Sequence, residues 1–206
     1  MNKIFSKKII EDFRDLMNED FYGAYNFDDV NGKDDWGLIC SQMDWIQMWV
    51  EEIENISFNN KSKYRNKINI AQFILGIDTI VNATKCLLNY FDIDYTEVKE
   101  EENIISEKFY PELDDYTYFK RIRSVCAIHP TDIKAGDNQF YAGWVNSIGD
   151  DFFIFIYNED SKEDNEQLKI KKNDLLLFAN KWYKKIKDIN SYIRPIIDEY
   201  KSNNSK

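Results

Sequence analysis

A chain of 206 residues with 43% hydrophobic and 16% aromatic residues can bury a core, which excludes an intrinsically disordered protein. Its formal net charge of −10 opposes long-range attraction to nucleic acids and anionic membranes, so RNA binding requires a local positive patch. We find no signal peptide and no apolar run long enough to span a bilayer, and therefore expect a cytoplasmic protein without a membrane partner.

The N-terminal part of the chain predicts three helices. Apolar residues at helical spacing predict a first helix over residues 3–17, and the Gly, Asp and Asn residues of 19–33 favour a loop. Apolar residues then recur at alternating steps of three and four. This pattern predicts a second helix from Asp34 or Asp35 to about residue 56, and a third that ends near Phe91.

The three cysteines give no metal-binding pattern. Cys40, Cys86 and Cys126 are far apart, odd in number and each set within an apolar helical pattern. We expect reduced, buried thiols. The sequence also lacks a Cys/His cluster and a glycine-rich phosphate loop, so we expect neither a metal ion nor another cofactor.

Residues 116–130, YTYFKRIRSVCAIHP, predict an amphipathic helix. Asp114 or Asp115 is suited to cap its start, and Pro130 disfavours helix beyond His129. At ~100° per residue, five side chains share an arc of about 120° that should face the core. They are Tyr118, Phe119, Ile122, Val125 and Cys126.

The same stretch holds a dense cluster of positive charge and the only histidine of the chain. Lys120, Arg121 and Arg123 lie within four residues, and Arg123 lies at the edge of the apolar arc. His129 follows near the helix end. A cation and a titratable imidazole at a helix end form a candidate site for phosphate binding and proton transfer.

Arg123-Ser124-Val125-Cys126-Ala127-Ile128-His129 has an arginine and a histidine with five residues between them, at the end of a late helix. This arrangement resembles the signature of the HEPN superfamily over about residues 34–130 plus the last helix. Many HEPN proteins are metal-independent RNases of toxin–antitoxin, abortive-infection and CRISPR systems, and they typically dimerise so that two Arg/His pairs line one cleft. Ser124 departs from the Asn, Asp or His often found there.

The resemblance implies an endoribonuclease, a toxin or phage-defence effector with RNA as substrate and an antitoxin protein as partner. His129 would act as general acid or base, Arg123 would bind the phosphate, and Lys120 and Ser124 would hold the substrate. The product would be a 2′,3′-cyclic phosphate. The alternative is a non-catalytic helical dimerisation or protein-interaction module. Asp78 in the third helix either orients a catalytic group or is a solvated or capping carboxylate.

After Pro130 the pattern changes from helical to extended. Aromatic and β-branched residues predict strands over 140–147 and 152–157, with a turn between them. Alternation around Leu168 and Ile170 predicts a third short strand. A final helix should begin at Asn173 or Asp174, and Pro195 should kink or end it.

These elements predict a mainly α protein with a single domain over 1–206. Segments 34–130 and 173–200 should form an antiparallel helical bundle, with a small antiparallel β-hairpin or meander over 139–172 inserted before the last helix. The helix seams and the many Trp and Tyr residues offer more apolar surface than one small bundle buries, so we expect a homodimer. Trp45 and Trp49 should lie in the core or in that interface.

Overall fold

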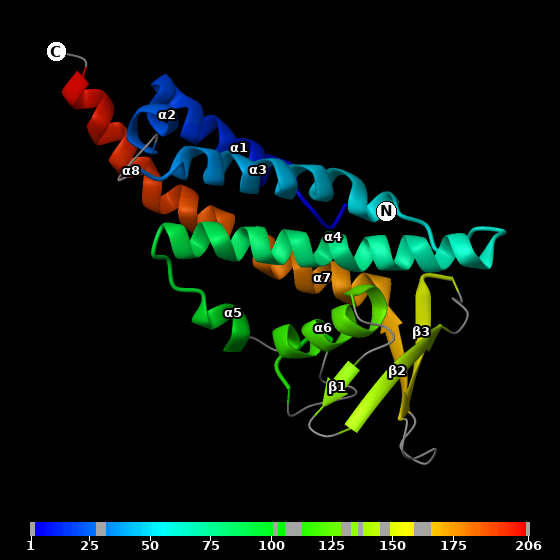
Figure 1. Cartoon of the computed structure of the whole chain (residues 1–206). Coiled ribbons are helices and arrows are strands. Elements are labelled where there is room, and N and C mark those ends of the chain that lie inside the picture. Colours follow the sequence, from blue (N-terminus) through cyan, green and yellow to red (C-terminus); the bar gives the residue numbers. More distant parts are fainter. Residues whose placement is uncertain are drawn as a thin grey trace. The chain divides into compact units, whose positions relative to one another are not determined.

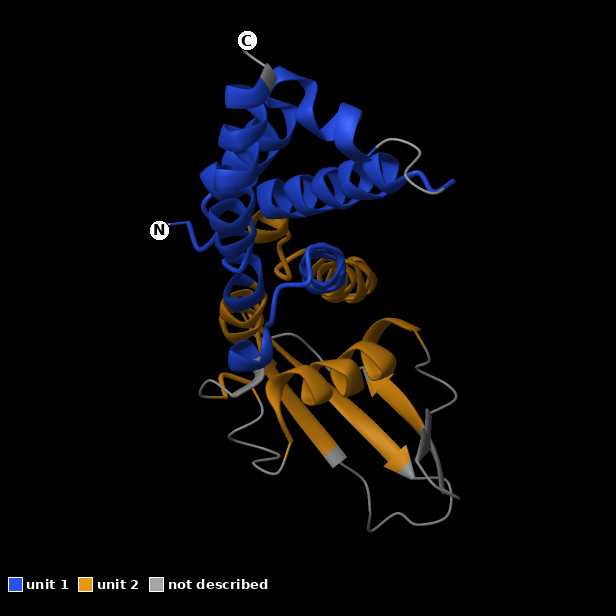
Figure 2. Ribbon diagram, turned by 90° about the vertical axis from the view of Figure 1, so that its left-hand side faces the viewer, with its two compact units in different colours: residues 1–52, 79–98, 180–206 blue, residues 53–78, 99–179 orange. Residues whose placement is uncertain are grey.

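The computed structural model confirms a mainly helical protein with one small antiparallel sheet (Figure 1). The chain divides into two compact units, which are coloured separately in Figure 2. Unit 1 comprises residues 1–52, 79–98 and 180–206, and unit 2 comprises residues 53–78 and 99–179. The expected single domain stays a prediction. The structure describes residues 3–27, 32–100, 103–105, 113–128, 133–135, 138–144, 149–158 and 166–204.

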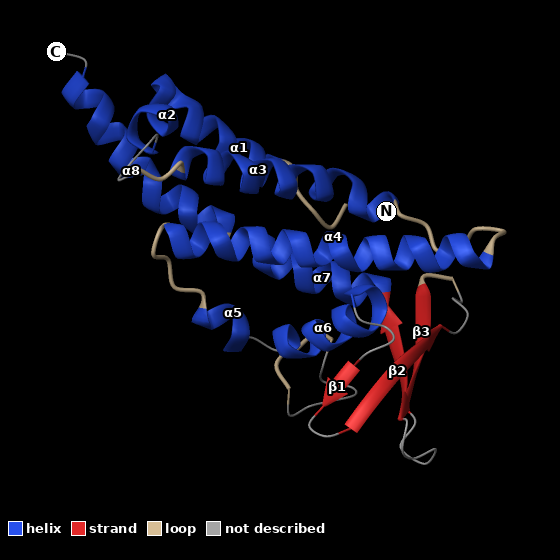
Figure 3. Cartoon of the chain, in the orientation of Figure 1, coloured by secondary structure: helices blue, strands red, loops and turns tan. Residues whose placement is uncertain are grey.

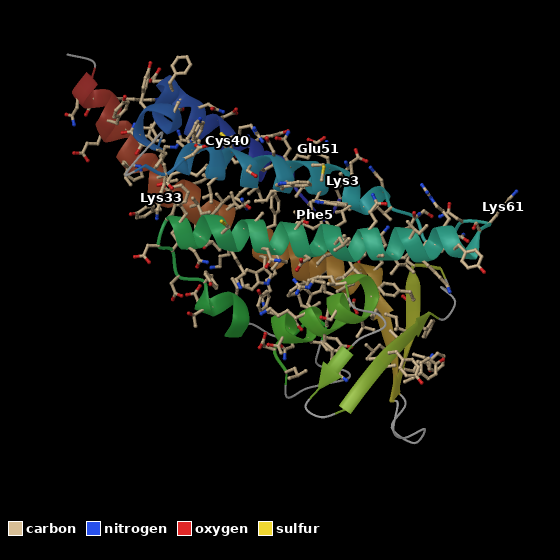
Figure 4. All side chains as sticks on the ribbon, in the orientation of Figure 1. Lys3, Phe5, Lys33, Cys40, Glu51 and Lys61 are labelled. Carbon is tan, nitrogen blue, oxygen red and sulfur yellow. The ribbon has the colours of Figure 1, made fainter. Side chains whose placement is uncertain are left out.

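Unit 1 is built from helices. Its first helix buries one face, as its periodicity predicts, and packs against α8 and α3. Phe5, labelled in Figure 4, lies just before that helix and meets the ring of Tyr183 edge-on, with centroids 5.7 Å apart. The elements of this unit are α1 (Lys8–Asn18), η1 (Glu19–Phe21), α2 (Tyr22–Phe27), α3 (Asp35–Glu52), part of α4 (Lys63–Tyr90), part of α5 (Thr96–Glu100), the end of α7 (Lys172–Tyr183) and α8 (Ile186–Asn204).

The predicted loop over 19–33 is wrong in its first half, where the chain forms η1 and α2. Asp20 and Phe21 adopt positive φ angles of 48° and 58°, which separate α2 from α1. Gly23 lies inside α2 rather than in a turn. A Cβ atom there would collide with the ring of Trp36, so this glycine permits close packing within unit 1.

The last helix differs from its prediction in where it breaks. A turn at Lys184 and Lys185 separates α7 from α8, and α8 continues through Pro195 to Asn204. Burial explains why the proline does not end the helix. Ile189, Ile193 and Ile197 are buried at steps of four residues, and their packing stabilises helix on both sides of Pro195.

Helix α4 is a long and largely apolar helix. Its segment Tyr64–Tyr90 is long enough and just apolar enough to cross a membrane, but 56% of its most apolar window is buried inside the protein. A water-soluble protein commonly buries a core helix of this kind. The helix therefore gives no argument for a membrane partner.

Unit 2 contains the whole sheet, drawn red in Figure 3. Its strands pair antiparallel in the order β1-β2-β3-β4, so β1 is added to the predicted two or three strands. Phe152, Ile154 and Ile156 are buried at alternating positions of β3, as a half-buried strand requires. The elements are η2 (Ile53–Asn55), the first part of α4, α6 (Asp115–Arg123), η3 (Ser124–Ile128), β1 (Ile133–Ala135), β2 (Asn138–Trp144), β3 (Asp151–Asn158), β4 (Glu166–Lys171) and the first part of α7.

Lysine 172, the first residue of α7, joins the end of the sheet to the η2 region within unit 2. The Lys172 Nζ donates hydrogen bonds to the carbonyl oxygens of Glu54 and Ile56, at 3.0 and 2.7 Å. It also lies 5.4 Å from the ring centroid of Phe58. Burial lowers the pKa of the Lys172 ammonium, and the two carbonyl groups supply the hydrogen bonds that a half-buried cation needs.

The two aspartates at the start of α6 have different roles. Asp114 is the N-cap, because its Oδ1 accepts a hydrogen bond of 2.9 Å from the Thr117 amide. Asp115 is buried instead. Its carboxylate accepts hydrogen bonds from the amides of Ile104 and Ile105, at 2.7 and 2.9 Å, and so ties the preceding segment to the helix.

We predict that Asp115→Ala destabilises the protein by about 2–3 kcal/mol, because two backbone N–H groups lose their charged acceptor. Urea denaturation followed by circular dichroism measures this loss. Asp198→Ala is the matched control, since it removes an exposed carboxylate from α8 and should change the free energy of unfolding by less than about 0.5 kcal/mol. Equal effects of the two variants would contradict the anchoring role of Asp115.

Candidate functional site

The predicted inward face of the amphipathic helix is confirmed. Its five apolar residues are buried in α6 and η3, and the ring centroid of Phe119 lies 5.1 Å from that of Phe178 in α7. Arg123 lies half-buried at the edge of this face, as its helical position predicts. The end of α6 thus places the positive charge of Arg123 beside the buried apolar residues of the helix.

Arg123 forms an ion pair with Asp78 of α4, and both residues belong to unit 2. Its Nη1 donates to both carboxylate oxygens, at 3.0 and 3.2 Å. The two side chains are 27% and 20% exposed, so water screens the pair only partly. Asp78 therefore orients the Arg123 guanidinium, and its role beside a catalytic group stays a prediction.

The helix widens directly after Arg123. Residues Ser124–Ile128 form a π-helical turn, and the Ser124 amide donates to the carbonyl oxygens of both Lys120 and Arg121. A π turn shifts the residues after it around the helix axis, and such turns are frequent at functional sites. Ser124 itself is half-buried. The candidate motif therefore contains a local departure from α-helix that the sequence analysis did not foresee.

Lys120 and Arg121 keep the exposed side of α6 positive. Both side chains are exposed, and the Lys120 Nζ lies 4.4 Å from the ring centroid of Tyr116, which is a cation–π distance. Arg123, on the flank of the helix, pairs with Asp78. The exposed side of α6 is therefore a local positive patch on an acidic protein.

His129 and Pro130 lie outside the described residues, and helical structure is described as far as Ile128. The helix end predicted at Pro130 therefore lies outside the described residues. The proximity of His129 to Arg123 stays a prediction. Of the four residues expected in the site, the structure places Lys120, Arg123 and Ser124 on one continuous helical segment.

The cysteines are free, but their burial differs from expectation. Cys126 is buried, whereas Cys40 and Cys86 are only half-buried. Burial raises the pKa of all three thiols, which keeps them protonated at neutral pH. Across the described ranges, no group of three or more His, Cys, Asp or Glu side chains is arranged to hold a metal ion.

A small hollow beside α6 was missed by the sequence analysis. It measures about 210 Å³ and lies between Tyr118 and Ile122 of α6 and the end of β4. Lys169 and Lys171 line it, together with Asp174 of α7. Alternation along β4 predicts that both lysines lie on the exposed face of the strand. Only the tertiary structure shows that this part of the strand lies beside α6.

Comparison of the chain with protein-family models, with curated proteins and with solved structures gives no match. The chemistry of the site therefore rests on its own residues.

We predict a coupling free energy of about 1–2 kcal/mol between Arg123 and Asp78. Arg123→Met leaves the Asp78 carboxylate half-buried without its counterion, and Asp78→Asn does the same to the guanidinium. The double variant should therefore lose less stability than the sum of the losses in the two single variants. A double-mutant cycle by urea denaturation measures this coupling. Additive effects would show that the ion pair contributes nothing to the fold.

Proposed function

We propose that this protein is a metal-independent endoribonuclease of the HEPN type, with Arg123 and His129 as its reactive pair. The observation that carries the proposal is the half-buried guanidinium of Arg123, which Asp78 orients at the end of a helix with an exposed basic side. The last turn of α6 carries Lys120, Arg121 and Arg123 in an otherwise acidic protein. Phosphate recognition accounts for this local concentration.

The pairing with Asp78 leaves Arg123 able to bind a phosphate. A guanidinium has five N–H donors, and both contacts to Asp78 use Nη1. In the described part of the chain the two N–H groups of Nη2 have no hydrogen-bond partner, so they can donate to a phosphate oxygen. Asp78 also limits the rotation of the side chain, which reduces the entropy lost when substrate binds.

The chemistry follows from the residues of the motif. One base, assigned to His129, takes the proton of a ribose 2′-hydroxyl, and the oxygen attacks the adjacent phosphorus. The bond from phosphorus to the 5′-oxygen breaks, that oxygen receives a proton, and a 2′,3′-cyclic phosphate remains. Arg123 stabilises the charge that develops on the phosphate oxygens, while Lys120 and Ser124 hold the flanking backbone. The need for a 2′-hydroxyl selects RNA over DNA.

We further propose a homodimer that uses α3. Trp45 is 50% exposed rather than part of the core, and Leu38 and Met48 are exposed close to the same side of this helix. Positions 38, 45 and 48 fall within about 80° of one another at ~100° per residue, so they form one apolar stripe. A stripe of this kind on a soluble protein indicates a protein contact.

The biological setting belongs to the same proposal. Unrestrained cleavage of cellular RNA is toxic, so such an enzyme would act in the cytoplasm as a toxin or phage-defence effector under the control of an antitoxin protein. The α3 stripe is the surface for which the second copy and the antitoxin would compete.

A non-catalytic protein-interaction module is the second candidate. One observation favours it: Asp78 neutralises Arg123, which weakens the attraction of that residue for a phosphate. The exposed α3 stripe serves a binding module equally well. The two candidates differ in whether purified protein cleaves RNA.

We predict that the purified protein cleaves RNA in the presence of EDTA and leaves 2′,3′-cyclic phosphate ends. His129→Ala should lower the rate by about 10²–10⁴-fold, because a general acid or base is lost. Arg123→Ala should lower it by about 10²–10³-fold through lost charge stabilisation. Gel analysis of an RNA substrate, with end-group analysis of the products, measures both effects.

Arg65→Ala is the matched control, since it removes an exposed arginine of α4 that lies outside the positive patch of α6. Its rate should stay close to that of the wild type. Melting curves of all variants separate lost activity from lost folding. If the wild type leaves RNA intact while remaining folded, or if EDTA abolishes cleavage, the endoribonuclease proposal fails and the interaction module replaces it.

We predict that light scattering at micromolar concentration gives twice the chain mass of 24.6 kDa. Trp45→Lys should shift the protein to monomer, because burying an unpaired charge in an apolar interface is unfavourable. Leu177→Lys, which places a charge at an exposed apolar position of α7, is the control and should remain dimeric. A monomeric wild type would refute the dimer.

A further inference from the structure

A second hollow, of about 430 Å³, lies wholly within unit 1. It is formed by α2, by the end of α4 and by α8, three elements labelled in Figure 1. Five aromatic rings line it: Tyr22 and Phe27 of α2, Tyr90 at the end of α4, Phe91 directly after it, and Tyr192 of α8. Its size falls in the range of small-molecule sites, which measure about 300–1,000 Å³.

The aromatic rings around the hollow stand nearly perpendicular to one another. Phe27 meets Tyr22 at 81° and Tyr90 at 73°, with centroids 5.8 Å apart in both pairs. Tyr90 and Phe91 meet at 89°, with centroids 5.0 Å apart. Because neighbouring rings are perpendicular, their π faces point in several directions. An arrangement of this kind can surround a rounded group, whereas parallel stacked rings would favour a flat one.

Contacts outside the hollow hold these rings in place. The Tyr90 hydroxyl donates to the Asp35 carboxylate at 3.2 Å, and the ring of Tyr22 packs edge-on against Tyr200 at 5.2 Å. Burial, together with the nearby Asp35 charge, raises the pKa of Tyr90 to about 12, so its ring remains a neutral phenol at neutral pH. The walls are therefore preorganised before a ligand arrives.

Asp92 supplies a negative charge among the lining residues. This aspartate follows the end of α4, is exposed and has a left-handed φ of 52°. Within the described ranges, no Lys, Arg or His forms an ion pair with it. An unpaired carboxylate beside an otherwise apolar hollow disfavours anions and adds to the attraction that the π faces exert on a cation.

We propose that this hollow binds a small organic cation through a methylated ammonium head group. A quaternary ammonium is rounded and weakly hydrated, and its positive charge is attracted by the negative faces of aromatic rings. Asp92 adds a direct Coulomb attraction, and the net charge of −10 draws cations to the protein as a whole. Ile193 and Ile196 complete the apolar lining for the methyl groups. This site is independent of the proposed RNase chemistry, since none of its residues belongs to unit 2.

Calorimetric titration with choline tests the proposal, and 3,3-dimethylbutan-1-ol is the matched ligand because it replaces the charged nitrogen with neutral carbon at the same shape. We expect saturable binding of choline at about millimolar affinity or better, and at least about tenfold weaker binding of the alcohol. Two outcomes would overturn the proposal. One is equal binding of both compounds, which would show an ordinary apolar hollow, and the other is no binding of choline.

Two variants assign the binding to this hollow. Tyr192→Leu keeps an apolar side chain at a 53% exposed position but removes a π face, and Asp92→Asn removes only charge, since Asn also accepts a left-handed φ. Each should weaken choline binding by roughly threefold to thirtyfold. Tyr25→Leu, at an exposed ring outside the hollow, should leave the affinity unchanged.

A final comparison separates a free small molecule from a modified protein. A short peptide that carries trimethyllysine presents the same head group on a chain. Choline binding that both variants weaken supports the small-molecule site. Unchanged choline binding in both variants, confirmed as folded by melting curves, would overturn it, as would saturable binding of the peptide without any binding of choline.

Discussion

The ion pair between Arg123 and Asp78 is the constraint on which the candidate site depends. It links α6 to α4 inside unit 2 through two contacts of one nitrogen, at 3.0 and 3.2 Å. Removing two charges from water costs free energy. The attraction between the charges offsets this cost only when their hydrogen-bond geometry is good. The same geometry leaves two of the three guanidinium nitrogens without a contact to Asp78, because both hydrogen bonds use Nη1.

The two units present opposite chemistry within one acidic chain. The end of α6 in unit 2 gathers Lys120, Arg121 and Arg123, whereas the hollow of unit 1 combines aromatic faces with the carboxylate of Asp92. Net charge by itself predicts neither arrangement, since a value of −10 only describes the field at long range. Local contacts determine which ligand each surface attracts, and salt screens the long-range part over about 10 Å.

Local patterns in the sequence determined the fold class and much of α6. Apolar residues at helical spacing predicted the buried faces of α1, α3 and α4, because burial of an amphipathic stripe dominates helix stability. Asp114 was predictable as an N-cap from its position before the helix, and alternation predicted β3 and β4. The order of Arg123, Ser124 and the residues up to His129 was visible in the sequence, but whether the arginine and the histidine meet was not.

Only the tertiary structure decided the contacts between distant segments. Arg123 and Asp78 are 45 positions apart, and the sequence around either residue does not predict that they form an ion pair. The aromatic hollow joins three segments whose rings appear in the sequence as separate core residues. Gly23 favoured a turn by type but packs under Trp36, and Pro195 favoured a helix end but remains inside α8. In each case long-range packing outweighed local propensity, because burial summed over several residues exceeds even the roughly 3 kcal/mol that proline costs in a helix interior.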